Sequence, residues 1–286
     1  LVAVAVGDRR AAISVLVVGS YVNKHWRVWY YRNDPVLPDA PKRDGLYFGY
    51  FGCTHEQVAE TKGHVNVLCE VQFEPENATK HMTECGTDIM LALSCQLFDR
   101  PDKQSKFTVR PDAETRLSDF FVAIQLAGAL DRVKALTPID EPNNTLASAD
   151  ELTHAIYIIR QVAQQFPLLD GYKLYCVYAA DKPFMCSEQF DWIGFDDYDM
   201  KGNVLNGKQY KDLKASLRVG QKTIIIPGGS YGQDPTPFVN YAKANTEVAV
   251  VLCFLWADDE WGTVGAQGIR SNATKTQYIN AGKSVI

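Results

Sequence analysis

The chain has 286 residues, of which 46% are hydrophobic and 22% are charged, and its formal net charge is −5. These values are ordinary for a folded globular protein and exclude a disordered chain. The mildly acidic balance, without any block of Lys and Arg, gives no electrostatic support for a nucleic-acid or anionic-membrane partner. No run of about 18 apolar residues indicates a membrane span.

The first predicted element occupies residues 1–34 and is a β-hairpin or a cap on the bottom of the following domain. Its residues 11–34 are rich in β-branched and aromatic side chains, which are typical of strands. The stretch DPVLPDAPKRDG (34–45) then links this element to the rest of the chain. Proline and glycine at this density favour a linker over a helix or strand.

Eight short apolar runs follow, and each is predicted to form a β-strand. They are 46–52, 64–71, 88–98, 133–142, 173–179, 191–199, 223–232 and 248–258. Stretches with helical spacing of apolar residues separate them, and the longest of these are 114–133 and 149–166. Ser148 lies three residues before Glu151, which is the spacing of a capping box at the start of the second helix.

This alternation of strands and helices predicts repeated βα units and a parallel sheet. Eight such units close a barrel, whereas fewer would leave an open sheet. We therefore predict a single α/β domain over 1–286, a (β/α)₈ TIM barrel over 46–286 with the N-terminal hairpin before it. In such barrels the working site lies at the carboxyl ends of the strands.

Acidic side chains follow several of these strand ends. They are Glu70, Asp140, Glu141, Asp196, Asp197 and Asp258. On the sixth strand, alternation places Ile193 and Phe195 toward the helices and Asp196 toward the barrel axis. On the second strand, the same argument predicts that Val67 and Cys69 point outward and Glu70 inward. On the fourth strand, the pattern leaves open which of Asp140 and Glu141 points into the site.

The run PIDEPN (138–143) at the end of the fourth strand resembles the Asn-Glu-Pro signature of the large (β/α)₈ glycoside hydrolase clan. The resemblance implies that Glu141 is a general acid/base, and Trp256 after strand eight resembles the clan's sugar-platform tryptophan. Asp140 stands where the clan has asparagine. The clan's nucleophile is a glutamate that ends strand seven, whereas this strand runs into PGGS (227–230).

Glycosidic cleavage requires one protonated carboxyl group and one ionised carboxylate, which lie roughly 6.5–9.5 Å apart in inverting enzymes. Strands four and six are next-but-one neighbours in the predicted barrel, with about 4.8 Å between adjacent strands. We therefore predict Glu141 as the acid and Asp196 as the base. The predicted substrate-binding residues are Tyr47, Glu70, Asp140, Asn143, Asp197, Tyr231, Trp256 and Asp258.

The predicted function is a glycoside hydrolase acting on a polysaccharide or oligosaccharide, without an organic cofactor or a metal site. Two alternatives stay open. A carbohydrate-binding barrel without catalysis would explain the missing strand-seven glutamate. An enzyme acting on a phosphorylated substrate would use the glycine-rich turn 227–230 as a phosphate cradle. A polysaccharide substrate favours a secreted or surface-displayed protein, and no oligomeric state is predicted.

Overall fold

The computed structural model describes residues 2–3, 15–22, 25–32, 45–54, 56–70, 85–99, 106–196, 207–258 and 267–286. For the first three of these ranges and for Glu70 it describes the backbone only.

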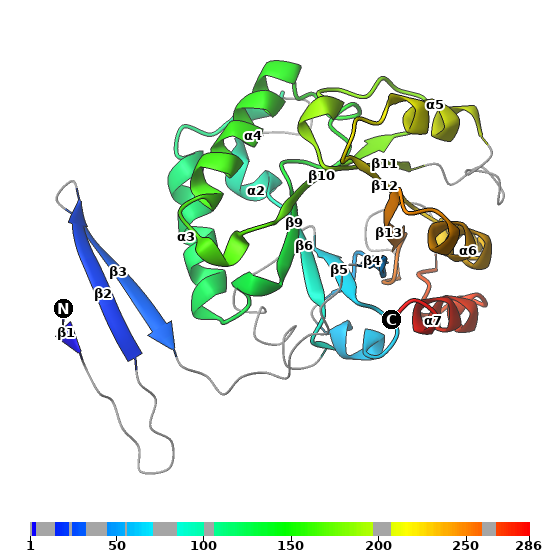
Figure 1. The fold of residues 1–286 in the computed structure, drawn as a ribbon, viewed down its shortest axis with the longest axis horizontal. Helices are drawn as coiled ribbons and strands as arrows, with labels where there is room; N and C mark the ends of the chain where they lie inside the picture. The colour runs from blue at the N-terminus through cyan, green and yellow to red at the C-terminus, as the bar shows by residue number, and fades with distance from the viewer. Residues whose placement is uncertain are drawn as a thin grey trace, which may run out of the picture.

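Parallel strands close an eight-stranded barrel in the order β10-β11-β12-β13-β4-β5-β6-β9 (Figure 1). In chain order the strands are β4 (Tyr47–Phe51), β5 (Val67–Glu70), β6 (Asp88–Ala92), β9 (Val133–Thr137), β10 (Lys173–Ala179), β11 (Trp192–Asp196), β12 (Lys222–Ile225) and β13 (Val248–Cys253). Each of the eight predicted runs overlaps one barrel strand, so the predicted TIM barrel is confirmed.

Helices lie on the outside of the barrel strands in Figure 1. The α-helices are α2 (Ser94–Leu97), α3 (Ala113–Leu126), α4 (Ala149–Ala163), α5 (Lys208–Ser216), α6 (Thr236–Ala244) and α7 (Lys275–Lys283). The short 3₁₀ helices are η1 (Val58–Thr61), η4 (Leu130–Arg132), η5 (Pro167–Leu169), η6 (Ser187–Gln189) and η8 (Gly229–Tyr231). Both predicted long helices are present as α3 and α4.

The start of α4 shows half of the predicted capping box. The Ser148 hydroxyl accepts a hydrogen bond from the Glu151 amide at 3.2 Å. The Glu151 carboxylate instead accepts from the Val109 amide at 2.6 Å. It therefore ties the helix to the short antiparallel pair β7 (Phe98–Asp99) and β8 (Thr108–Val109) instead of closing the box.

Several of the predicted runs extend beyond the strands that the structure shows. The run 88–98 was predicted as one strand, but β6 ends at Ala92 and α2 follows it. Near the N-terminus, β2 (Val15–Val22) and β3 (His25–Arg32) pair antiparallel as the predicted hairpin. β1 (Val2–Ala3) adds a third strand to this sheet. The placement of the hairpin as a cap on the barrel stays a prediction.

Side chains of the barrel strands divide between an interior cluster and the layer under the helices. Ile193 and Phe195 pack in the helix layer, as predicted. On β5 the prediction was wrong, because Val67 and Cys69 belong to the interior cluster while Leu68 packs outward. Strands of a parallel barrel are buried on both faces, so polarity does not mark which face is inside.

Candidate active site

A small cavity lies inside the carboxyl end of the barrel. Its lining residues are Phe51, Asp140, Val177, Asp196, Ile226, Leu252 and Phe254. The free volume is about 10 Å³, which is room for about one water molecule. Two of the seven residues are carboxylic acids and the other five are apolar, so the cavity places two acids in an apolar wall.

Asp140 follows β9 and Asp196 ends β11, with β10 between those two strands. The structure therefore brings these two predicted residues together. Burial raises the pKa of Asp140 to about 7, the negative charge of Glu141 adds to this shift, and a backbone hydrogen bond from Glu141 acts in the opposite direction. A carboxyl group with this pKa holds its proton close to neutral pH and can donate it.

Glu141 does not line this cavity. Its backbone has φ of 43°, in the left-handed region that non-glycine residues seldom adopt. Its amide donates to the Val177 carbonyl at 3.1 Å, and its carboxylate accepts from the Asn144 side chain at 2.7 Å. The choice that the sequence left open between the two acids therefore falls on Asp140 as the cavity-lining residue. The catalytic role expected for Glu141 stays a prediction.

Asn143 fastens this loop to the barrel. Its side-chain amide donates to the Ala179 carbonyl at 3.0 Å and its oxygen accepts from the Ala179 amide at 2.8 Å. These contacts fix the segment after β9 against the end of β10, next to Asp140. Asn143 was predicted to bind substrate, but in this structure its polar atoms are engaged with the backbone.

The predicted sugar platform is not formed by Trp256, because its side chain is fully buried. The indole packs on the rings of Tyr50 and His64, at centroid distances of 4.5 and 5.6 Å. Its Nε1 donates to Glu60 at 3.3 Å. Phe254, two residues earlier, lines the cavity instead and lies 5.5 Å from the Phe51 ring.

Asp258, another predicted substrate-binding residue, belongs to an ionic network on the rim. Its carboxylate accepts from the Gly268 amide at 3.0 Å and from the Ser271 hydroxyl, and lies 3.6 Å from Arg270. Arg270 also donates to both oxygens of Glu60, at 2.6 and 3.1 Å. This bidentate hydrogen bonding lowers the pKa of Glu60. The network joins the segment after β4 to the segment after β13.

The glycine-rich turn after β12 does not form the predicted phosphate cradle. The Gly228 amide donates to the Gln233 side chain at 2.8 Å. The Gly229 and Ser230 amides donate to the carbonyls of Pro227 and Phe254, each at 3.0 Å. These N–H groups are already bonded within the protein and are not free for an anion. Tyr231, at the end of the turn, is 48% exposed.

The remaining predicted residues divide into one that is misplaced and two that the structure does not describe. Tyr47 begins β4 and lines a cavity that also contains the strand-starting Lys173 and Lys222, so it lies at the amino end, away from the predicted site. Phe51, at the other end of β4, is one of five apolar lining residues that sequence reasoning missed, although period-two alternation from Tyr47 points to it. The Glu70 side chain and Asp197 lie outside the described residues.

The part of the chain that the structure describes contains neither a candidate metal site nor a candidate membrane-spanning helix. Within that part of the chain, no group of three or more His, Cys, Asp or Glu side chains could hold a metal ion. No helix found there is both long and apolar enough to cross a membrane.

No protein-family model matches the chain, and no curated protein matches its sequence. Among solved structures, a GH2 beta-galacturonidase from Eisenbergiella tayi bound to glycerol has a TM-score of 0.58 at 10% identity, covering 98% of this chain and 55% of that one. The Ruminococcus gnavus beta-glucuronidase with uronic isofagomine has a TM-score of 0.55 at 12% identity, covering 95% and 55%. A fungal beta-1,4-galactanase structure has a TM-score of 0.50 at 11% identity, covering 78% and 94%.

The chain therefore spans about half the length of the two uronidases that it matches. At these identities the likeness is one of fold: this chain has the barrel architecture that those glycoside hydrolases contain.

Proposed function

We propose that this protein is a glycoside hydrolase that cleaves a polysaccharide or oligosaccharide at the carboxyl end of its barrel. The observation that carries the proposal is the shared cavity of Asp140 and Asp196. Two carboxyl groups at this end of a barrel form the arrangement that glycoside hydrolysis uses. That glycosidases are among the proteins with this fold agrees with the proposal.

In the proposed reaction Asp140 is the general acid and Asp196 the general base. Asp140, whose pKa burial raises to about 7, gives its proton to the leaving glycosidic oxygen as the C–O bond breaks. A water molecule attacks the anomeric carbon, and Asp196 accepts its proton. The reaction consumes one water molecule and forms two hydroxyl groups, one on the leaving group and one on the anomeric carbon. One strand, β10, lies between the strands that carry the two acids. The acids are therefore two strand steps apart, at about 4.8 Å per step, and their expected spacing is near the roughly 6.5–9.5 Å of inverting enzymes.

Glu141, which the resemblance implied as the acid, is the rival for that role. In the proposal it supports Asp140 instead, because its negative charge helps to raise the Asp140 pKa. The two assignments differ in what a neutral glutamine at position 141 does. If Glu141 is the general acid, Glu141→Gln removes that acid. If Asp140 is the general acid, Glu141→Gln removes only a negative charge next to it.

Reducing-sugar release from a panel of polysaccharides tests the proposal. We expect Asp140→Asn and Asp196→Asn each to lose activity by about 10²–10⁴-fold, the usual contribution of general acid–base catalysis. Wild-type activity should fall as pH rises through about 7, where Asp140 loses its proton. Glu141→Gln should keep more than about a tenth of the activity, with the fall moved to lower pH because Asp140 loses a negative neighbour. Asp212→Asn, an exposed change on α5, is the matched control.

The outcomes separate the assignments. Loss of activity in Glu141→Gln together with survival of Asp140→Asn would return the acid role to Glu141. Loss in Asp212→Asn would mean that the assay reports stability and not catalysis. A wild-type protein that releases no sugar from any polysaccharide contradicts the enzymatic proposal.

The second candidate is a carbohydrate-binding barrel without catalysis. It is favoured by the turn after β12, where Pro227, Gly228 and Gly229 leave no carboxylate at the position of the clan's nucleophile. Glycan binding without sugar release, unchanged by Asp140→Asn, would support this candidate. Either function suits a secreted or surface-displayed protein.

A further inference from the structure

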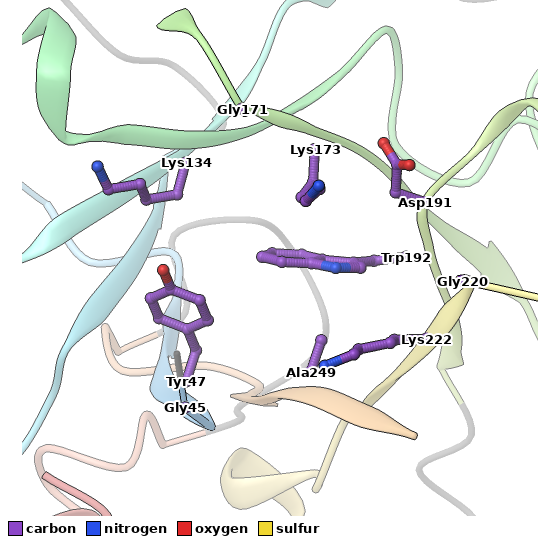
Figure 2. Close-up of a pocket in the computed structure, with 10 residues that line it drawn as sticks. All are labelled: Gly45, Tyr47, Lys134, Gly171, Lys173, Asp191, Trp192, Gly220, Lys222 and Ala249. Atoms are coloured by element: carbon purple, nitrogen blue, oxygen red, sulfur yellow. The ribbon is translucent and has the colours of Figure 1, made fainter. Parts of the chain in front are cut away.

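A second and larger cavity opens at the amino end of the barrel. It has a volume of about 470 Å³, which lies within the range of small-molecule sites. Figure 2 shows its lining residues: Gly45, Tyr47, Lys134, Gly171, Lys173, Asp191, Trp192, Gly220, Lys222 and Ala249. Three of these ten residues are lysines, in a chain whose net charge is −5.

Aromatic rings form the inner wall of this amino-end cavity. Trp192 begins β11, is 7% exposed, and belongs to the interior cluster of the barrel. Tyr47 begins β4, and its ring lies 5.7 Å from the indole at an interplanar angle of 47°. The two rings offer apolar surface of the kind that packs against the face of a ligand ring.

Strand register directs two of the lysines to this aromatic wall. Lys222 is the direct neighbour of Trp192 in the β11–β12 pairing. Lys173 lies two residues before Tyr175, which faces the barrel interior, so Lys173 is on the interior side as well. Figure 2 shows Lys173 and Lys222 on opposite sides of the Trp192 indole.

Lys134 is different, although it lines the same cavity. It precedes the interior residue Ala135, so alternation turns it outward. Its ammonium group donates to the Asp131 carbonyl at 2.6 Å, and Figure 2 shows it pointing away from Trp192. Lys134 therefore supplies charge near the cavity without reaching its centre.

The acidic side chain in the lining does not pair with these lysines. Asp191 accepts a hydrogen bond from the Leu174 amide at 2.8 Å. Among the described residues, neither Lys173 nor Lys222 has an acidic partner within 4.0 Å. Two ammonium groups beside one aromatic wall raise the local concentration of anions.

We propose that this amino-end cavity binds a small ring compound that carries a phosphate or carboxylate group. The oxyanion interacts with Lys173 and Lys222, and the ring lies against Tyr47 and Trp192. This site is separate from the proposed hydrolase site at the other end of the barrel, and it does not depend on that function.

Calorimetric titration of the full chain tests the proposal with glucose 6-phosphate, glucuronate, phenyl phosphate and uncharged glucose. At least one of the three anions should bind with a Kd below about 1 mM, and glucose should not bind. The pattern among the anions identifies the source: sugar phosphate, sugar acid or aromatic phosphate. Lys173→Met and Lys222→Met should each weaken binding by at least about tenfold, the effect of losing one hydrogen bond to a charged group.

Lys134→Met is the matched control, since it removes the same charge from the same cavity wall. Lys134→Met should weaken binding by less than about threefold, because it removes only a long-range attraction that salt screens. Absence of binding by all three anions at about 10 mM would overturn the proposal. Equal losses in the three lysine variants would also overturn it, because they would show unspecific attraction to a positive surface. Sugar release, where the wild type shows it, should be unchanged in all three variants.

Discussion

The two ends of the barrel differ in the charge they present and in the room they leave. At the carboxyl end, Asp140 and Asp196 face a cavity of about 10 Å³. At the amino end, Lys173 and Lys222 face one of about 470 Å³. Acidic groups in a tight apolar wall change their protonation, which suits proton transfer. Basic groups around an open cavity attract anions, which suits binding an anionic ligand.

The two ends also differ in how their charged side chains are held. At the carboxyl end, Arg270 ties Glu60 and Asp258 into one network. At the amino end, the described residues place no acid against Lys173 or Lys222. A TIM barrel ordinarily uses its amino end for stability. Neutralising a charged side chain should therefore change stability much more at the carboxyl-end cavity than at the amino-end cavity.

The largest stability effect is expected at the carboxyl end. Since the folded-state pKa of Asp140 is raised to about 7 from an unfolded value near 3.8, its contribution to stability is present below the unfolded value and is lost as pH rises through about 7. Asp140→Asn, which cannot ionise, should therefore stabilise the protein at pH 8 by up to about 4 kcal/mol and have little effect at pH 4.

Urea unfolding of the two proteins at both pH values measures this difference. Asp212→Asn, at an exposed site, should change stability by less than about 0.5 kcal/mol at either pH. Equal stability of wild type and Asp140→Asn at pH 8 would show that Asp140 is not held protonated by the fold. The acid role proposed for it would then be contradicted.

A smaller effect is expected at the rim of the same end. The Glu60 carboxylate accepts hydrogen bonds from Arg270 and from the Trp256 indole. Glu60→Gln removes its charge and should destabilise the protein by about 1 kcal/mol at low salt. Because the folded-state pKa of Glu60 is lowered, its contribution is present above the unfolded pKa and is lost as pH falls through the lower folded value.

Thermal unfolding at two salt concentrations measures this contribution. The control is Asp212→Asn, which breaks the exposed Lys208–Asp212 pair on α5 and should cost about 0.3–0.5 kcal/mol. A Glu60→Gln effect no larger than this control would mean that the bidentate geometry adds nothing to the rim.

The fold was predictable because it is a repeated pattern. β10 has the predicted bounds, since a turn at Gly171 and the polar residues after Ala179 mark both of its ends. The predicted run that contains β6 is too long, because Cys95, Leu97 and Phe98 continue its apolar character and a four-residue helix is too short to show a helical period. The facing of β5 was inverted, because both of its faces are buried.

The candidate site was less predictable, because it depends on single backbone dihedral angles and on how deeply each side chain is buried. The φ of 43° at Glu141 turns that residue out of strand geometry, and no spacing rule reveals it. Trp256 follows a strand at the expected place, yet the partners that bury it, Tyr50 and His64, come from an earlier segment of the chain. The assignment of Asp196 to the interior face succeeded, because Ile193 and Phe195 fixed the alternation.

The smallest stability effect is expected at the amino end, for Lys173→Met. Methionine keeps much of the apolar stem, and the ammonium group it removes has no acidic partner among the described residues. The change should leave stability within about 0.5 kcal/mol of wild type. Any gain should appear at low salt, where Lys173 and Lys222 repel each other most, and vanish at high salt. A loss above about 1 kcal/mol would show that Lys173 supports the barrel. Stability within about 0.5 kcal/mol of wild type would mean that the fold does not need Lys173, and a ligand would then explain this lysine beside a buried indole better than stability does.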